Sequence, residues 1–297
     1  MKKALFIILG LLAGVPALLA QGNALTFTRI DRNPVTSALA GAGSASTGNA
    51  AWSAFSNASV LPFYEGTLDA AVSYRNWAPG LWKAMHVNAG VACKVTPQFG
   101  VSLGYALQKG AEQEGFKPTD QVIALGLAYG LGQKWAVGVN GRFAMQQLTE
   151  SVRYTGFSGD AFVAWQPTGS LRLTAGLSTL GTNVTSASGK SYRQPASAGV
   201  AADWVLAPGG SHTIELVADG DFFFSGGFTA AAGLQYGWND MVFLRGGYRF
   251  ATDGCVIPSH AALGAGFKLA GFRLDVSWLT ASEALGNTIC LGLAYGF

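Results

Sequence analysis

The chain has 297 residues, of which 49% are hydrophobic and only 12% are charged, whereas a soluble domain carries about 25% charged residues. With 41 glycines in addition, this composition excludes a disordered polar chain, a coiled coil and a typical helical enzyme, and it favours a membrane-embedded or all-β protein. The net charge of +3 comes from 19 basic and 16 acidic residues. No run of basic residues could bind along a phosphate backbone, so we expect no nucleic acid partner.

Residues 1–20 are the first predicted element, a cleaved signal peptide. Lys2 and Lys3 give it a positive start, an apolar stretch follows, and the small residue Ala20 ends it. The alternative is an uncleaved membrane anchor, which fits less well because two glycines and Pro16 interrupt the apolar stretch. We therefore expect the protein to be exported.

The segment 21–65 is rich in Ala, Gly and Ser, and it shows little alternation of apolar and polar residues. Its apolar content would not be stable in an exposed tail. If the following strands enclose a lumen lined by small residues, this segment can fill it. We expect it to fold inside as a plug, with a periplasmic tail as the alternative.

From residue 66 to 297, large apolar residues alternate with small or polar ones, which is the pattern of β-strands. The predicted strands are 66–77, 84–95, 98–109, 120–130, 134–146, 155–166, 170–180, 194–206, 211–219, 226–238, 240–251, 259–269, 271–280 and 287–297. These make fourteen, and an even number lets a barrel close with every strand antiparallel to its neighbours.

The less hydrophobic face of the strands, made of small and polar residues, indicates whether they lie in water or in a membrane. In 98–109, for example, Leu103 and Tyr105 alternate with Ser102 and Gly104. A soluble sandwich would cover its outer face with charged residues, and this face is too poor in charge for that. We therefore predict that the bulky residues face lipid and the small ones line a lumen, with tryptophans and tyrosines near strand ends as interfacial belts. A buried aromatic core is the alternative.

The predicted connections alternate in length. Short ones lie near 96–98, 131–134, 167–169, 208–210, 238–240 and 270–271, and longer ones at 110–119, 181–193, 252–258 and 281–286. Short periplasmic turns and longer outer loops are typical of a bacterial outer-membrane barrel. The sequence therefore predicts an all-β, fourteen-stranded antiparallel transmembrane β-barrel in the bacterial outer membrane, in contact with its lipid.

The stretch "NPVTSALAGAGSAST" and the following "AAWSAFSNASVLPF" resemble the opening of the PorV/PorQ family and of the wider FadL-like barrels. Those proteins carry an aromatic-x-Asn-Pro-Ala-x-Leu motif, matched here by Phe55, Asn57, Ala58 and Leu61, with Ala58 in place of Pro. In "LTAGLSTLGTNV", which resembles a later segment of the family, Thr179 stands where Asn is usual. The resemblance implies a FadL-like barrel with an N-terminal plug, 21–65, followed by the barrel, 66–297.

Eleven charged residues fall on the small-residue face and are candidates for contacts inside the barrel. Seven of them are the main candidates, namely Arg142, Asp160, Arg172, Arg245, Arg249, Arg273 and Asp275, and the other four are Asp203, Glu215, Asp219 and Lys268. Because both signs are present, we expect internal salt bridges that hold the plug, whereas a selective pore would show one sign at a constriction.

Enzymatic motifs are absent from the sequence. His86, His212 and His260 lie on separate predicted strands, and none has a neighbouring Ser or Cys in a motif such as G-x-S-x-G. The three cysteines show no CxxC spacing. We therefore expect neither an enzyme nor a cofactor or metal site.

Two functions follow from the resemblance. The PorV likeness implies binding of secreted proteins or translocon subunits in type IX protein secretion, and the FadL-like fold implies passage of a hydrophobic small molecule through a plugged barrel with a lateral opening. The first needs exposed apolar loop residues, for which the candidates are Trp77, Leu81, Trp82, Phe222, Phe223 and Phe224. The three phenylalanines are expected in an outer loop, or alternatively at a strand end packed on a neighbouring loop.

Overall fold

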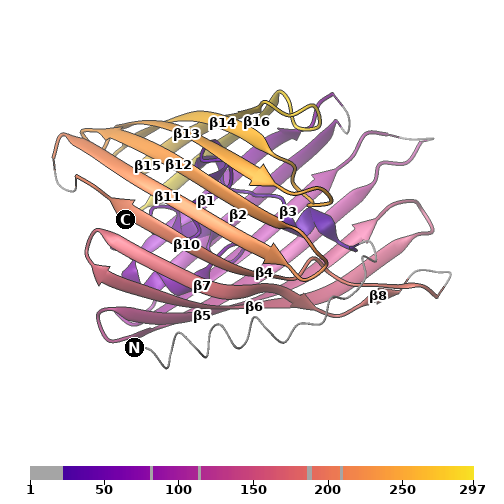
Figure 1. The fold of residues 1–297 in the computed structure, drawn as a ribbon, viewed down its shortest axis with the longest axis horizontal. Helices are drawn as coiled ribbons and strands as arrows, with labels where there is room; N and C mark the ends of the chain where they lie inside the picture. The colour runs from indigo at the N-terminus through magenta and orange to yellow at the C-terminus, as the bar shows by residue number, and fades with distance from the viewer. Residues whose placement is uncertain (1–22, 81–82, 113–114, 186–188, 208–209) are drawn as a thin grey trace.

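The computed structural model describes residues 23–80, 83–112, 115–185, 189–207 and 210–297. Fourteen antiparallel strands form a closed barrel in which each strand pairs with its neighbours and β1 pairs with β16 (Figure 1). The predicted signal peptide, 1–20, lies outside the described residues. Within the described ranges, no helix has the length and apolar character needed to cross a bilayer.

The barrel strands agree with the predicted ones to within a few residues. They are β1 (Leu68–Trp77), β2 (Ala84–Lys94), β3 (Phe99–Lys109), β4 (Thr119–Leu131), β5 (Trp135–Gln147), β6 (Arg153–Thr168), β7 (Leu171–Gly181), β10 (Ser197–Val205), β11 (His212–Phe223), β12 (Phe228–Trp238), β13 (Val242–Ala251), β14 (His260–Leu269), β15 (Phe272–Thr280) and β16 (Thr288–Gly296). A separate two-stranded sheet of β8 (Val184–Thr185) and β9 (Ser191–Tyr192) lies in the loop between β7 and β10. The largest difference is at β11, which continues to Phe223 instead of ending at residue 219.

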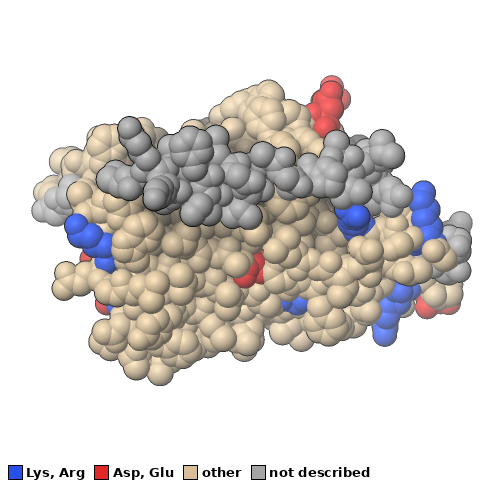
Figure 2. All heavy atoms as spheres, turned by 60° about the horizontal axis from the view of Figure 1, so that its bottom comes forward, with Lys and Arg blue, Asp and Glu red and all other residues tan. Residues whose placement is uncertain are grey.

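The predicted orientation of the strands is confirmed. On β3, for example, Leu103 and Tyr105 are exposed on the outside, while Ser102 and Gly104 are buried on the inside. On the face of the barrel that Figure 2 shows, few charged side chains lie over the middle, and most lie toward the two ends. A closed strand ring leaves no unpaired edge, and its apolar outer face suits hydrocarbon. The chain is therefore a bacterial outer-membrane β-barrel.

Residues 23–66, called the inner segment below, lie within the ring of strands (Figure 1, indigo). This segment contains four short helices, namely η1 (Thr26–Arg29), α2 (Pro34–Ala38), η2 (Ala50–Trp52) and η3 (Ala58–Phe63). Asn33 caps α2 by accepting a hydrogen bond from the backbone N–H of Val35 at 3.0 Å, and Pro34 suits the first helical turn because it needs no N–H partner. Such short helices are not stable alone and depend on the surrounding barrel.

Glycines on the inner face of the barrel make room for this segment. A Cβ atom added to Gly138 of β5 would lie 2.3 Å from the backbone nitrogen of Ser59. At Gly104 of β3 it would lie 2.3 Å from the ring of Phe55. These approaches are closer than any side chain allows, so the high glycine content reflects direct packing of the inner segment on the strands.

Candidate functional site

A cavity of about 170 Å³ lies between the inner segment and the strands β6, β7, β10 and β11. We call it the long-loop cavity because Val256 and Ile257, from the loop between β13 and β14, also line it. Its lining combines aromatic and charged side chains, including Arg29, Phe55, Arg142, Phe162 and Phe223. Such a lining suits a small molecule with a largely apolar body.

A second cavity of about 390 Å³ lies on the other side of the inner segment, toward the short turns. The backbone of residues 40–44 separates the two cavities. Arg249 of β13 donates hydrogen bonds to the carbonyls of Ala40, at 2.9 Å, and Gly41, at 3.3 Å. Asp219 of β11 accepts from the N–H groups of Gly43, at 2.7 Å, and Ser44, at 3.1 Å. This partition is therefore held to the barrel by one cation and one anion.

An apolar groove lies on the outer face of the same strands. It is lined mainly by small or aromatic residues, among them Trp135, Trp165, Leu173, Ala175, Ala202 and Ala218. Four residues line both this groove and the long-loop cavity, namely Thr174, Val200, Asp219 and Gly220. The inner cavity and the outer groove therefore meet across one thickness of the wall.

All seven main candidates among the charged residues expected in the lumen point inward, and their partners lie on other strands or on the inner segment. The carboxylate pairs are Arg142–Asp160, Arg172–Asp203 at 3.2 Å, Arg245–Asp275 at 2.6 Å and Arg273–Asp69. Arg249 instead binds the carbonyls of the partition. Because desolvated charges are costly alone, these pairs explain how arginines can lie inside the barrel.

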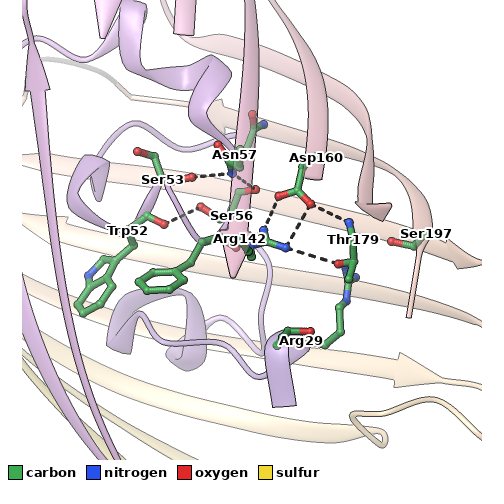
Figure 3. Close-up of polar contacts among 12 residues, drawn as sticks. Arg29, Trp52, Ser53, Ser56, Asn57, Arg142, Asp160, Thr179 and Ser197 are labelled. Carbon is green, nitrogen blue, oxygen red and sulfur yellow. Dashed lines mark hydrogen bonds and ion pairs between the residues drawn. The ribbon is translucent and has the colours of Figure 1, made fainter. Parts of the chain in front are cut away.

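The Arg142–Asp160 pair connects the inner segment to an irregularity in the wall (Figure 3). Arg142 on β5 donates to both carboxylate oxygens of Asp160 on β6, and its Nη2 also donates to the carbonyl of Phe55 at 2.8 Å. Asp160 Oδ1 accepts the backbone N–H of Thr179 at 2.7 Å. The side chains of Arg142 and Asp160 are 4% and 0% exposed, so this network is fully buried.

Some interior charges were not anticipated from the sequence. Arg75 of β1 is 1% exposed and donates to the hydroxyl of Ser37. Arg32 of the inner segment donates to three backbone carbonyls, including that of Ile30 at 2.8 Å. Burial lowers the pKa of Arg32 to about 9, so it keeps its charge at neutral pH. Counting by twos along β1 places Asp69 and Arg75 on the inner face, so the sequence pattern could have predicted these two interior charges.

Three of the four motif residues, Phe55, Ala58 and Leu61, pack against strands β3, β4 and β5. The side chain of Asn57 caps η3 by accepting from the N–H of Ser59 at 3.0 Å, and its amide donates to the carbonyl of Ser44 at 3.2 Å. Ala58 is fully buried, and Leu61 packs against Gly100 of β3. Ala58, in the position that Pro occupies in the family motif, is thus the first residue of η3 and directly follows its capping residue Asn57.

The residues expected to form an exposed docking surface are distributed differently. Trp77 is only 7% exposed, because it continues the inward-facing row of β1, and its ring stacks on His86 at 5.7 Å. Phe222 and Phe223 belong to β11 and not to an outer loop, with exposures of 52% on the outside and 6% on the inside. Phe224 directly follows the strand, and its N–H binds the carbonyl of Ala196 at 3.0 Å. Leu81 and Trp82 lie outside the described residues.

Alternation is therefore kept at the run of phenylalanines, which lies at the end of a strand, as in the alternative expectation, and not in an outer loop. The inward ring of Phe223 lies 5.0 Å from the guanidinium of Arg29, which explains why an aromatic residue is accommodated inside.

Among the described residues, no group of three or more His, Cys, Asp or Glu side chains could hold a metal ion.

Comparison with known proteins gives similarity in structure and not in sequence. No family model and no curated protein matches the chain. Among solved structures, the monoaromatic hydrocarbon channel CymD matches with a TM-score of 0.65 and 11% identity, over 89% of this chain and 96% of that one. The Ralstonia pickettii toluene transporter TbuX matches with a TM-score of 0.62 and 11% identity, over 89% and 97%.

A Pseudomonas aeruginosa FadL homologue matches with a TM-score of 0.51 and 12% identity, over 89% of this chain and 95% of that one. At such low identity the likeness shows the fold alone, which is a FadL-like outer-membrane barrel. It confirms the expected fold, whereas membership of the PorV/PorQ family stays a prediction.

Proposed function

We propose that this protein is an outer-membrane channel for hydrophobic small molecules, which enter the long-loop cavity and leave sideways through the barrel wall. The observation that carries the proposal is the position of the cavity and the outer groove on opposite sides of the same wall, with Thr174, Val200, Asp219 and Gly220 in both linings. An apolar solute that leaves sideways reaches lipid without crossing the charged second cavity. The inner segment serves as the plug that blocks the direct route.

The named functions of the similar structures favour the same proposal, because two of them are described as channels or transporters of toluene or other monoaromatic hydrocarbons. A role in type IX protein secretion has less support. None of the three similar structures named above is described as a secretion component, and the expected docking residues Trp77 and Phe223 are buried. Recovery of secretion subunits or exported cargo in a mild-detergent pull-down would favour that role instead.

The proposal is tested by uptake in a bacterial strain without its own channel of this kind. Cells that make the protein should take up radiolabelled toluene or decanoic acid faster than cells with an empty vector, while uptake of a hydrophilic sugar should not change. If the two cell types take up both apolar probes equally, the proposal is wrong.

A filled cavity provides the matched variant for this assay. Thr174→Phe places a ring at the wall of the long-loop cavity and should lower toluene uptake several-fold. Leu103→Phe adds a ring on the outer face of β3, away from the cavity, and should leave uptake unchanged. Equal uptake by both variants would exclude this cavity from the route.

A further inference from the structure

The pairing between β6 and β7 shifts at two points, one between Gly159 and Ala161 and one between Trp165 and Thr168 near the short turn, and the first of these lies beside the long-loop cavity. Gly159 pairs with Leu180 and Ala161 pairs with Leu177, so Asp160 lies opposite two residues, Ser178 and Thr179. This is a β-bulge, and no ladder pair joins Asp160 to β7. The strands β1 to β5 pair with one another without such a shift.

Thr179 at this bulge has a strained backbone. Its φ of 58° lies in the left-handed region, which a β-branched residue rarely adopts. Such a conformation persists only where the surroundings enforce it. Here the enforcing group is Asp160, which accepts the Thr179 N–H, and Arg142 holds Asp160 in turn. The Asp160 side chain thus takes the place of a backbone partner for the Thr179 N–H.

The bulge also lies directly beside the long-loop cavity. Arg142 and Ser178 line the cavity, and so does Phe55, whose carbonyl accepts a hydrogen bond from Arg142. A solute in the cavity can therefore contact Arg142 of the ion pair and the Phe55 turn of the inner segment that binds it. At the bulge, Asp160 has no ladder pair on β7. Opening the wall between two regularly paired strands would leave more backbone N–H and C=O groups without partners, which is costly in lipid.

We propose that the wall opens between β6 and β7 at the Thr179 bulge, and that the Arg142–Asp160 ion pair is the latch that keeps it closed. This inference rests on the proposed function and names its exit. The inner segment holds the latch in place through the Phe55 carbonyl. When an apolar solute displaces that turn, Arg142 loses one of its acceptors, the hold on Thr179 weakens, and the solute passes between the two strands into the lipid.

The latch is tested first without any solute, by hydrogen exchange measured by mass spectrometry on the protein in lipid nanodiscs. Asp160→Asn keeps an oxygen for the Thr179 N–H but removes the charge that holds Arg142. Amides of residues 157–161 and 177–181 should then exchange about tenfold faster than in the unmodified protein.

Asp203→Asn is the matched control. Asp203 forms another buried pair, with Arg172. Arg172 likewise donates to an inner-segment carbonyl, that of Ala45 at 2.9 Å, but does not touch the bulge. Its effect on exchange should stay near its own pair. Equal exchange at 177–181 in both variants, or no increase in Asp160→Asn, would overturn the latch.

The exit is tested by a disulfide across the bulge. Gly159→Cys with Leu180→Cys places two thiols on directly paired outward positions, and Leu103→Cys with Leu125→Cys does the same between β3 and β4. Oxidation of the first pair should abolish toluene uptake and reduction should restore it, while oxidation of the second pair should have no effect.

The outcomes separate this inference from the proposed function. Uptake that persists through the oxidised bulge pair would overturn the exit but leave the channel intact. Absence of toluene and decanoic acid uptake in the unmodified protein would overturn the channel and the exit together, and the exchange experiment would still decide whether the ion pair controls the bulge.

Discussion

Two stretches of the barrel wall differ in how they meet the inner segment. Along β1 to β5, called the packed wall, the strands pair continuously and glycines such as Gly104 and Gly138 lie directly against η2, η3 and the turn between them. Along β6, β7, β10 and β11, called the cavity wall, a cavity separates strands and segment, and the pairing between β6 and β7 is shifted. Both stretches have small inward residues, so the position of the inner segment decides where the lumen is filled.

The largest effect is expected where the packed wall binds the inner segment through a buried charge. Asp69 is fully buried, accepts the N–H of Ala51 at 2.9 Å and pairs with Arg273. Asp69→Asn leaves Arg273 without its charged partner and should lower the free energy of unfolding by about 3–5 kcal/mol. Urea unfolding in lipid vesicles, followed by tryptophan fluorescence, measures this loss.

The control for that change is an exposed pair. Asp240, whose side chain is 72% exposed, pairs with Lys268 at 2.6 Å near a short turn. Asp240→Asn should change the free energy of unfolding by less than about 1 kcal/mol, because water screens this pair. Equal losses in the two variants would show that the inner segment does not depend on Asp69.

A smaller effect is expected from overfilling the packed wall. Gly138→Val forces a side chain against the backbone of Ser59 and should lower the free energy of unfolding by about 1–3 kcal/mol, with faster trypsin cleavage of the inner segment. Gly141 lies on the same strand but faces outward, with nothing within 4 Å of its Cβ position. Gly141→Val should therefore be neutral, and a comparable loss there would contradict the close packing of the inner segment.

The smallest effect is expected where the two walls join. Trp135 of β5 and Trp165 of β6 stack with their ring centroids 5.5 Å apart. Trp165→Ala should cost about 0.5–1.5 kcal/mol more than Trp204→Ala, because Trp204 is also outward-facing but has no ring partner among the described residues. If the two losses are equal in the same urea assay, the stack does not stabilise the junction.

Most of the fold could be predicted because the alternation of strand residues has a period of two and a lipid-exposed barrel must be closed. The same alternation placed Arg142, Asp160 and Arg172 inside. It could not reveal which of them would pair, since pairing depends on register between strands. Nor could it reveal the bulge at Thr179, where one additional residue on β7 exchanges the inward and outward positions of the residues that follow in that strand.

Two misplacements came from residue type. Trp77, the last residue of the predicted strand 66–77, was expected to be exposed because docking of a protein needs exposed aromatic residues, although counting by twos from Asp69 through Arg75 puts it inside. The run of phenylalanines was assigned to a loop because consecutive apolar residues suggest a broken strand. The inward position of Phe223 depends on Arg29, which is nearly two hundred residues away in sequence and therefore invisible to a local pattern.

The seam between β1 and β16 has a consequence for biogenesis. It joins Asp69 to Gly296 and Asn76 to Ile289, and so connects the first and the last barrel strand of the chain. The inner segment precedes β1 in the chain but ends up enclosed. We therefore expect the inner segment to enter the barrel before β1 pairs with β16, while the sheet is still open. If this pairing formed first, the barrel would close without the inner segment inside it.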